Sequence, residues 1–161
     1  MDESGEKDIP GGWKWGVYAM FMGQYGHTID AKGRTVVPVQ YRQSLGDTFV
    51  ITRGLDGCLF LYPLQEWQVF VDKLQALPSD QKTRKLQRQF LSKAMEVTPD
   101  KQGRILIPSL LRDKAGLVKD IVFVGMMNRI EIWDKARLEA EEDEEDGSLL
   151  EMVMDGLDIS I

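Results

Sequence analysis

The chain has 161 residues, of which 43% are hydrophobic and 29% charged, enough for one ordinary domain or two small ones packed together. Its apolar residues are interspersed with charged ones, which excludes a membrane-spanning run of roughly 18–20 apolar residues. The formal net charge is −6, and the single cysteine, Cys58, excludes an intramolecular disulfide framework and favours a reducing, cytoplasmic location.

The negative charge belongs to the two ends of the chain. Residues 139–161 carry ten acidic side chains and no basic one, and residues 1–19 carry four acidic and two basic. The segment 20–138 therefore holds 18 basic and 12 acidic side chains. A basic body favours a polyanionic partner such as nucleic acid in spite of the negative total. The first 19 residues lack the basic and apolar regions of a secretory signal, and we expect them to be a mostly disordered extension.

One nine-residue phrase occurs twice. The first copy is DAKGRTVVP at Asp30–Pro38 and the second is DKQGRILIP at Asp100–Pro108. Aspartate, glycine, arginine and proline keep the same relative places in both copies. A lone Asp-x-x-Gly is an ordinary turn, but two copies with the same continuation indicate an internal duplication.

The first copy predicts two strands, a turn between them and a short helix. Residues 25–29 alternate as a strand does. Asp30 can accept a backbone N–H two residues on, and Gly33 can take a positive φ, as in a hairpin with a bulge. Residues 34–37 predict a second strand, buried on both faces. The proline that ends the phrase and a glycine eight residues later bracket a helix over 39–45.

Two further strands complete the first unit, over residues 48–53 and 58–62, around a turn at 54–57. The second copy repeats the whole pattern, so each half of the chain reads β-β-α-β-β. Its predicted strands are 94–98, 104–107, 120–124 and 129–133, with a helix between the proline at 108 and the glycine at 116.

Two helices are expected between the repeats. Apolar residues at i, i+3, i+4 and i+7 over 67–74 form one stripe, after which Pro78 stops the helix and Ser79 can cap the next. The second helix carries a basic stretch, Lys82–Lys93, that either lines a DNA path or is a solvated face. Residues 134–146 look helical and increasingly acidic, and an apolar segment follows them.

The predicted fold class is therefore α+β, with two β-β-α-β-β modules packed together. The first module covers residues 24–67 and the second 94–137. A helical linker over 68–93 joins them, the extension 1–19 precedes them, and an acidic tail over 138–161 follows.

The basic residues of the phrase are the candidate DNA contacts. Arg34 and Arg104 can contact guanine O6 and N7 in bidentate fashion, and arginine also binds phosphate. Lys32 and Lys101 on the same turns would add sequence-independent phosphate contacts. In the competing interpretation, each arginine pairs with the aspartate of its own phrase and simply fixes the turn.

The other positions shared by the two copies of the phrase suit structural roles. Asp30 and Asp100 would repel phosphate if they faced it, so we expect them to form the turn and orient the arginine. Gly33 and Gly103 serve the backbone. No motif of a known enzyme class is present, so neither an enzyme nor a cofactor is expected. Two alternatives stay open: an assembly protein that binds an acidic partner, and a nuclease in which the two aspartates hold a divalent metal.

Taken together, the motifs resemble the MraZ family over about residues 20–137. The resemblance is carried by the two phrases and by three further runs: MFMG at 20–23, LYPLQEW at 61–67 and EIWD at 131–134. It implies two SpoVT-AbrB-like swapped-hairpin modules in a bacterial DNA-binding regulator of the division and cell-wall gene cluster. Asp30 with Arg34, and Asp100 with Arg104, match the family's Asp-x-x-x-Arg signature.

The resemblance further implies a homo-oligomeric ring, an octamer or larger, that presents paired loops to repeated promoter boxes. We therefore predict a cytoplasmic, nucleoid-associated, sequence-specific regulator of transcription, a repressor or an activator, that acts on its own operon. The acidic tail either is solvated or shields the basic surface from non-specific DNA.

Overall fold

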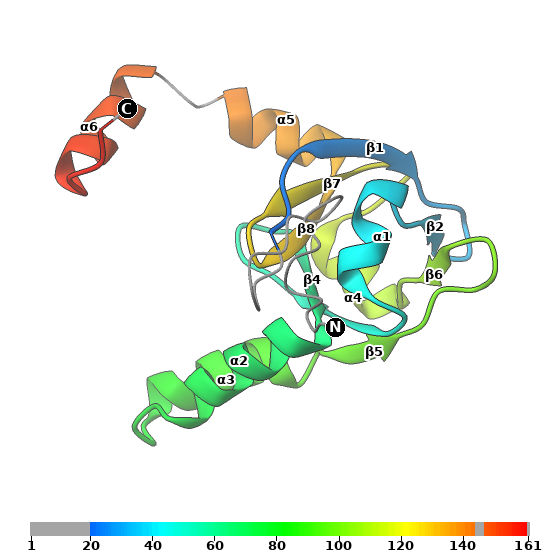
Figure 1. Ribbon diagram of the computed structural model, residues 1–161, viewed down its shortest axis with the longest axis horizontal. Helices are drawn as coiled ribbons and strands as arrows, with labels where there is room; N and C mark the ends of the chain where they lie inside the picture. The colour runs from blue at the N-terminus through cyan, green and yellow to red at the C-terminus, as the bar shows by residue number, and fades with distance from the viewer. Residues whose placement is uncertain (1–19, 144–146, 161) are drawn as a thin grey trace, which may run out of the picture.

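The computed structural model describes residues 20–143 and 147–160 (Figure 1). The predicted extension, residues 1–19, lies outside this range. The chain forms a six-stranded antiparallel sheet in the order β1-β7-β8-β4-β3-β5 and a separate ribbon of β2 and β6. The strands are β1 Gln24–Thr28, β2 Arg34–Val36, β3 Phe49–Arg53, β4 Leu59–Pro63, β5 Met95–Val97, β6 Arg104–Leu106, β7 Asp120–Met126 and β8 Arg129–Asp134.

Six helices accompany these strands within the described residues. They are α1 Val39–Leu45, α2 Leu64–Gln75, α3 Gln81–Leu91, α4 Ser109–Ala115, α5 Lys135–Asp143 and α6 Gly147–Gly156. The predicted α+β fold with two β-β-α-β-β units is confirmed. None of the described helices is long and apolar enough to cross a membrane.

The two halves of the chain exchange strands. The first strand of the first half, β1, pairs with β7 of the second half, and β5 of the second half pairs with β3 of the first. The ribbon likewise takes one strand from each half. Each half therefore completes the sheet of the other, and the core exists only when both are present.

The expectation that each phrase forms a hairpin is wrong. The turn closes, but β1 and β2 then diverge, because β1 is bound to β7 and β2 to β6. The hydroxyl of Thr35 donates to the carbonyl of Thr28 (2.8 Å) where the two strands separate. Local sequence sets the turn, while the pairing partner is chosen by the core.

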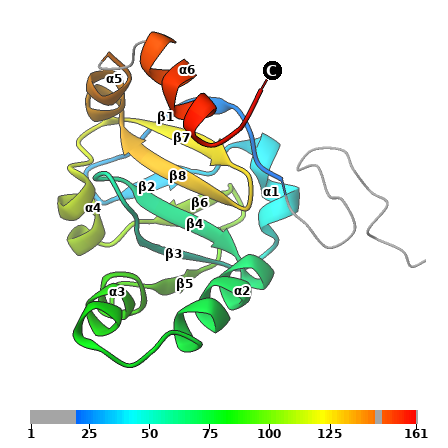
Figure 2. The ribbon, with the colours of Figure 1, turned by 90° about the vertical axis from the view of Figure 1, so that its left-hand side faces the viewer.

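The sheet carries a different hydrophobic layer on each face. One face packs against the ribbon, α1 and α4, in a core that includes Ile51, Leu61, Phe123 and Ile132. The other face carries an aromatic cluster under α2 and α3. These two helices lie in the lower part of Figure 2. The sheet thus holds the ribbon on one side and the helical pair on the other.

Other local predictions are adjusted by the structure. The segment 34–37 is not buried on both faces. Thr35 and Val37 are buried, whereas Arg34 and Val36 are half-buried, because only one face of the ribbon packs against the core. The helix α2 begins at Leu64, earlier than expected.

The cap of α3 and the last hairpin also differ from expectation. Asp80 caps α3 in place of Ser79, since it immediately precedes the first helical residue and its Oδ1 accepts the N–H of Thr83 (2.8 Å). The β7–β8 loop is shorter than predicted. Gly125 lies within β7, where it pairs with Ile130, and the backbone of Met22 approaches it too closely for any side chain.

Candidate nucleic-acid interface

The first phrase folds into a turn that its own aspartate closes. Asp30 Oδ1 accepts the backbone N–H of Lys32 and that of Arg34, both at 2.9 Å. The N–H of Gly33 donates to the carbonyl of Asp30 (2.9 Å), and Gly33 has a φ of 89°. Glycine suits this position because a Cβ is disfavoured at positive φ.

The second phrase forms the same turn from different intervening residues. Asp100 Oδ1 accepts the N–H of Gln102 and that of Arg104, both at 2.9 Å, and Gly103 has a φ of 79°. The residues between aspartate and glycine therefore do not determine the turn. The aspartate and the glycine do.

Both carboxylates stay ionised at neutral pH. The pKa of Asp30 lies below its ordinary value, chiefly because the carboxylate accepts the backbone N–H of Arg34, and further because it accepts the side-chain N–H of Arg34. The pKa of Asp100 is lowered in the same way by the backbone and side-chain N–H groups of Arg104. Each turn thus presents a fixed negative charge to its arginine.

That charge orients the arginine without using up its donors. Arg34 Nε donates to Asp30 Oδ2 (3.0 Å), and Arg104 Nε donates to Asp100 Oδ2 (2.8 Å). Within the described part of the chain, no acceptor contacts the terminal amino groups of either guanidinium. The two side chains are 40% and 38% exposed. Pairing with the aspartate and contact with an outside acceptor are therefore compatible.

The ribbon brings the two arginines onto one face. Arg34 lies opposite Leu106, and Arg104 lies opposite Val36. Since side chains alternate along a strand, these four share the outer face, while Thr35 and its partner point inward. The arginines occupy diagonal positions, whose Cα atoms are typically about 7–8 Å apart.

The two turns lie at opposite ends of this ribbon, and each is hydrogen-bonded to the residue that follows the ribbon strand of the other repeat. The N–H of Val37 donates to the carbonyl of Gly103 (3.0 Å), and the N–H of Ile107 donates to the carbonyl of Gly33 (2.8 Å). Both turns lie at the right-hand side of Figure 1. The result is a pair of similar turns related by an approximate two-fold axis.

The candidate lysines sit on the tips of the two turns but not at matching places. Lys32 is the third residue of its turn and Lys101 the second of the other, and both side chains are exposed. The structure therefore brings all the sequence-predicted site residues together at one side of the molecule.

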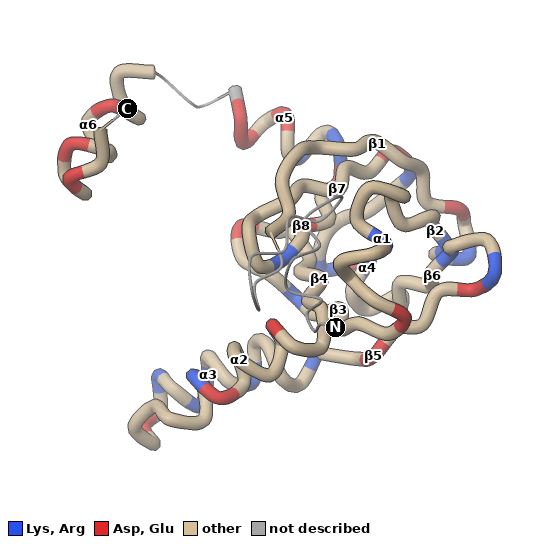
Figure 3. The backbone as a smooth tube through the Cα atoms, viewed as in Figure 1, with Lys and Arg blue, Asp and Glu red and all other residues tan. Residues whose placement is uncertain are grey.

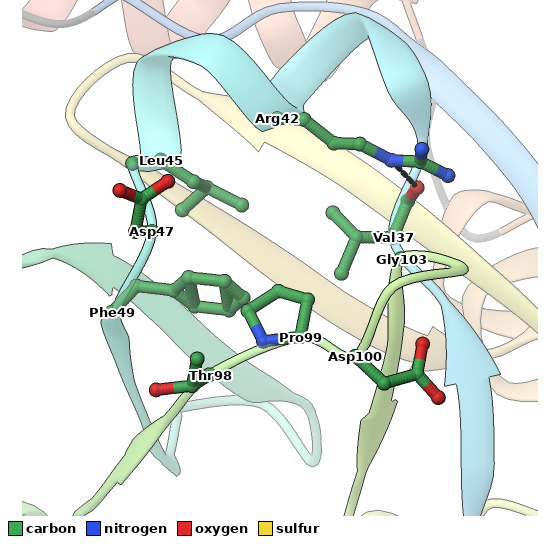
Figure 4. Close-up of a pocket in the computed structure, with 10 residues that line it drawn as sticks. Val37, Arg42, Leu45, Asp47, Phe49, Thr98, Pro99, Asp100 and Gly103 are labelled. Carbon is green, nitrogen blue, oxygen red and sulfur yellow. Dashed lines mark hydrogen bonds between the residues drawn. The ribbon is translucent and has the colours of Figure 1, made fainter.

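A second matched pair of arginines was missed by sequence reasoning. Arg42 Nε donates to the carbonyl of Val37, and Arg112 Nε donates to the carbonyl of Ile107, both at 2.9 Å. Arg42 lies against the turn of the other repeat, as Figure 4 shows. The signal was present in the sequence, because each of these arginines follows the proline of its phrase by four residues.

A groove runs beside Arg42, between α1 and the segment that leads into the second turn (Figure 4). Its volume is about 410 Å³, and its lining includes Asp47, Phe49 and Pro99. Acidic and apolar side chains share this lining with one guanidinium. The groove therefore offers little to a phosphate beyond the arginine itself.

The two aspartates do not form a metal site. Asp30 and Asp100 belong to turns at opposite ends of the ribbon, and each is already bonded to its own turn. Among residues 20–143 and 147–160, no group of three His, Cys, Asp or Glu side chains could hold a metal ion. This geometry gives no support to the nuclease alternative.

The two charged segments outside the phrases lie apart from the ribbon. The basic helix α3 projects from the opposite side of the molecule, and the acidic α5 packs on β7 and β8 (Figure 3). Gln24 on β1 donates to Glu142 on α5 (3.1 Å). Residues 144–146 of the acidic run lie outside the described part.

Comparisons with known proteins agree on one family. The family model described as "MraZ protein", and further as "antitoxin-like", matches the chain twice, over residues 20–89 and 90–154. A "Transcriptional regulator MraZ" from Lachnoclostridium phytofermentans is 60% identical over 121 residues, 75% of this chain and 86% of the relative. The protein of that name from Natranaerobius thermophilus is 45% identical over 143 residues, 88% of this chain and 100% of the relative. That from Ligilactobacillus salivarius is 56% identical over 126 residues, 78% of this chain and 88% of the relative.

Proposed function

The chain belongs to the MraZ family, one of transcriptional regulators and not of enzymes, and on that premise we propose that it binds repeated boxes in promoter DNA through its two phrase turns. The boxes lie in the promoter of its own division and cell-wall operon, and the protein is nucleoid-associated.

One observation carries this proposal. Two half-exposed guanidinium groups share one face of the ribbon, each oriented through Nε by an ionised aspartate. Their terminal amino groups have the fork geometry that matches guanine O6 and N7. Arg34 and Arg104 therefore read bases, while Lys32 and Lys101 bind the flanking phosphates.

The second arginine pair fits a phosphate-binding role, like that of the two lysines. Arg42 and Arg112 each follow a phrase strand and border the turn of the other repeat. Four guanidinium groups and two lysines thus surround one ribbon. Only the phrase arginines stand on its outer face, so only they are assigned to base contact.

Repeated boxes call for an oligomer. A single ribbon offers two base-reading side chains, and each bidentate contact contributes about 1–3 kcal/mol of discrimination. A ring of identical subunits on several boxes gains affinity through effective concentration, provided that the spacing of the boxes matches the spacing of the ribbons.

The test is a gel shift of the protein's upstream DNA against random DNA of equal length. We expect Arg34→Ala with Arg104→Ala to abolish the preference for upstream DNA. Arg53→Ala, which removes a half-buried arginine at the end of β3, is the matched control and should keep it. A double variant that still prefers the upstream fragment would refute the assignment.

The spacing of the boxes offers a second test. Inserting half a helical turn between boxes should weaken wild-type binding much more than inserting a full turn, because only the latter restores the facing of the sites. An assembly protein that binds an acidic partner would instead show equal competition by upstream and random DNA.

A further inference from the structure

The helix α3 presents four cationic side chains to solvent. Lys82, Arg84, Lys85 and Arg88 are all exposed, and the helix contains no acidic residue. We call these four residues the α3 cationic face. Within the described residues, none of them forms an ion pair, and Asp80 at the start of the helix is bonded to the N–H of Thr83.

The opposite side of α3 is fixed to the sheet. Phe90 is buried and stacks on Phe60 with ring centroids 6.1 Å apart. The hydroxyl of Thr52 donates to the carbonyl of Phe90 (2.6 Å), and Gln89 Nε2 donates to the carbonyl of Gly54 (3.1 Å). The cationic face is therefore held outward by the packing of the helix.

Unneutralised charge of this density opposes the helix that carries it. Arg84 and Arg88 are spaced i, i+4, and Lys85 and Arg88 are spaced i, i+3, so like charges lie on adjacent turns. Each such pair costs about 0.2–0.5 kcal/mol in an isolated helix. A polyanion laid along the face removes this repulsion, and salt screens it.

The helix α3 and the phrase turns lie on different sides of the sheet. In Figures 1 and 3 the turns lie at the right, whereas α3 lies at the lower left, and Figure 2 shows α3 in front of the sheet with the ribbon behind it. The sheet therefore separates α3 from the ribbon within one subunit.

We propose that the α3 cationic face is a second DNA site, which binds the phosphate backbone of a duplex without reading its bases. This inference rests on the proposed function for the identity of the polyanion. Lys82 to Arg88 span about 9 Å along the helix, which corresponds to about three phosphates of one strand. Each protein thus holds two DNA segments, one selected by the ribbon and one bound through charge alone.

Phosphate fits this face better than a membrane or a peptide. A helix that binds a lipid surface inserts an apolar face opposite its cations, and in α3 that opposite face is already packed on the sheet through Phe90. A peptide interface needs buried anchors. Helical periodicity places Leu86 and Leu91 at the two margins of the cationic face, so its centre offers charge alone.

The experiment replaces the four cations with glutamine, as K82Q, R84Q, K85Q and R88Q in one variant. Glutamine has a helix propensity similar to those of lysine and arginine. Binding to upstream and random duplexes is measured over a salt titration. Bridging is measured as capture of a labelled random duplex by protein bound to immobilised upstream DNA.

We expect the variant to keep the preference for upstream DNA, to lose bridging, and to show a salt slope smaller by about 3 per chain engaged on both sites, at about 0.9 for each of about three phosphates. The matched control, R34A with R104A, should lose the preference and keep salt-dependent binding of random duplex. Circular dichroism and light scattering check the fold and the assembled mass.

Three results would overturn the inference: an unchanged salt slope with bridging retained, an altered assembled mass, or binding of polyglutamate in place of duplex by the R34A, R104A protein. The second would make the face a contact between copies, and the third a protein-docking surface. A wild-type protein without preference for upstream DNA would refute the proposed function instead, while the slope on random duplex would still test α3.

Discussion

The two repeats build the same turn in different surroundings. In both, an aspartate accepts the N–H groups two and four residues on at 2.9 Å, and a glycine follows with φ near 80–90°. The intervening residues are Ala-Lys in one and Lys-Gln in the other. The aspartate and the glycine therefore encode the geometry of the turn in both copies of the phrase.

The neighbours of the turn have diverged. Gly33 abuts the backbone carbonyl of Ile107 as well as the side chain of Arg112, whereas the three atoms nearest to a Cβ on Gly103 all belong to the Arg42 guanidinium. The residue before the aspartate is Ile29 in the first repeat, where its N–H donates to Lys119, and proline in the second, which has no N–H to donate. The lesson is that duplication copies local geometry, after which tertiary contacts make the two copies unequal.

The largest expected effect comes from the glycines. A Cβ on Gly33 would lie 2.6 Å from the carbonyl oxygen of Ile107, which cannot move without shifting β6, whereas a Cβ on Gly103 would meet Arg42, which can swing away. Both alanine variants incur about 1–2 kcal/mol for positive φ, and Gly33→Ala about 1–3 kcal/mol more for the clash. Urea unfolding midpoints measure the difference; equal losses would show that the surroundings do not matter.

Replacing each phrase arginine by lysine is the next largest change. Lysine keeps the charge but lacks the fork, so we expect Arg34→Lys and Arg104→Lys each to reduce the preference for upstream over random DNA by about 1–3 kcal/mol. Binding to random DNA should stay nearly the same. Competition titrations measure both quantities, and a loss confined to one variant would show that only one repeat reads bases.

The second arginine pair should separate stability from binding. Arg112 is half-buried and Arg42 is exposed, although both donate to a strand carbonyl. Arg112→Ala should therefore lower the free energy of unfolding by about 1–3 kcal/mol, and Arg42→Ala by less. Each should reduce the salt slope of DNA binding by about 1 without changing sequence preference. A change of preference in either variant would assign it to the bases.

The smallest effect concerns the aspartates and pH. Their pKa values lie below the ordinary 3.8 in the folded chain, so their contribution to stability is complete above 3.8 and is lost as pH falls through the lower folded-state pKa. Asp30→Asn and Asp100→Asn should remove equal shares of this acid-induced loss, because the turns match. Unfolding midpoints from neutral pH to below 3.8 test this. Unequal shares would mean that the different surroundings of the two turns also change the stability that each aspartate contributes.

Much of the site could be predicted from the sequence because the turn is a local structure. Asp30 and Gly33 sit three residues apart, and their preferences for side-chain capping and positive φ need no distant partner. The basic character of the body and the short helices after each proline are local features too. Arg42 was missed because its role depends on a contact with the other repeat, although its matched offset from the proline could have drawn notice.

The sequence by itself determined the duplication, the two turns and the β-β-α-β-β order of each half. Only the tertiary structure decided which strands pair. β1 pairs with β7 and β2 with β6, although the local sequence predicted a hairpin. These pairings form because both halves are needed to bury Ile29, Thr35 and Ile105 in one core. The pairing of β2 with β6 also places the two arginines on one face. A single nine-residue phrase could not determine this, because the pairing of strands depends on burial and register across the whole fold.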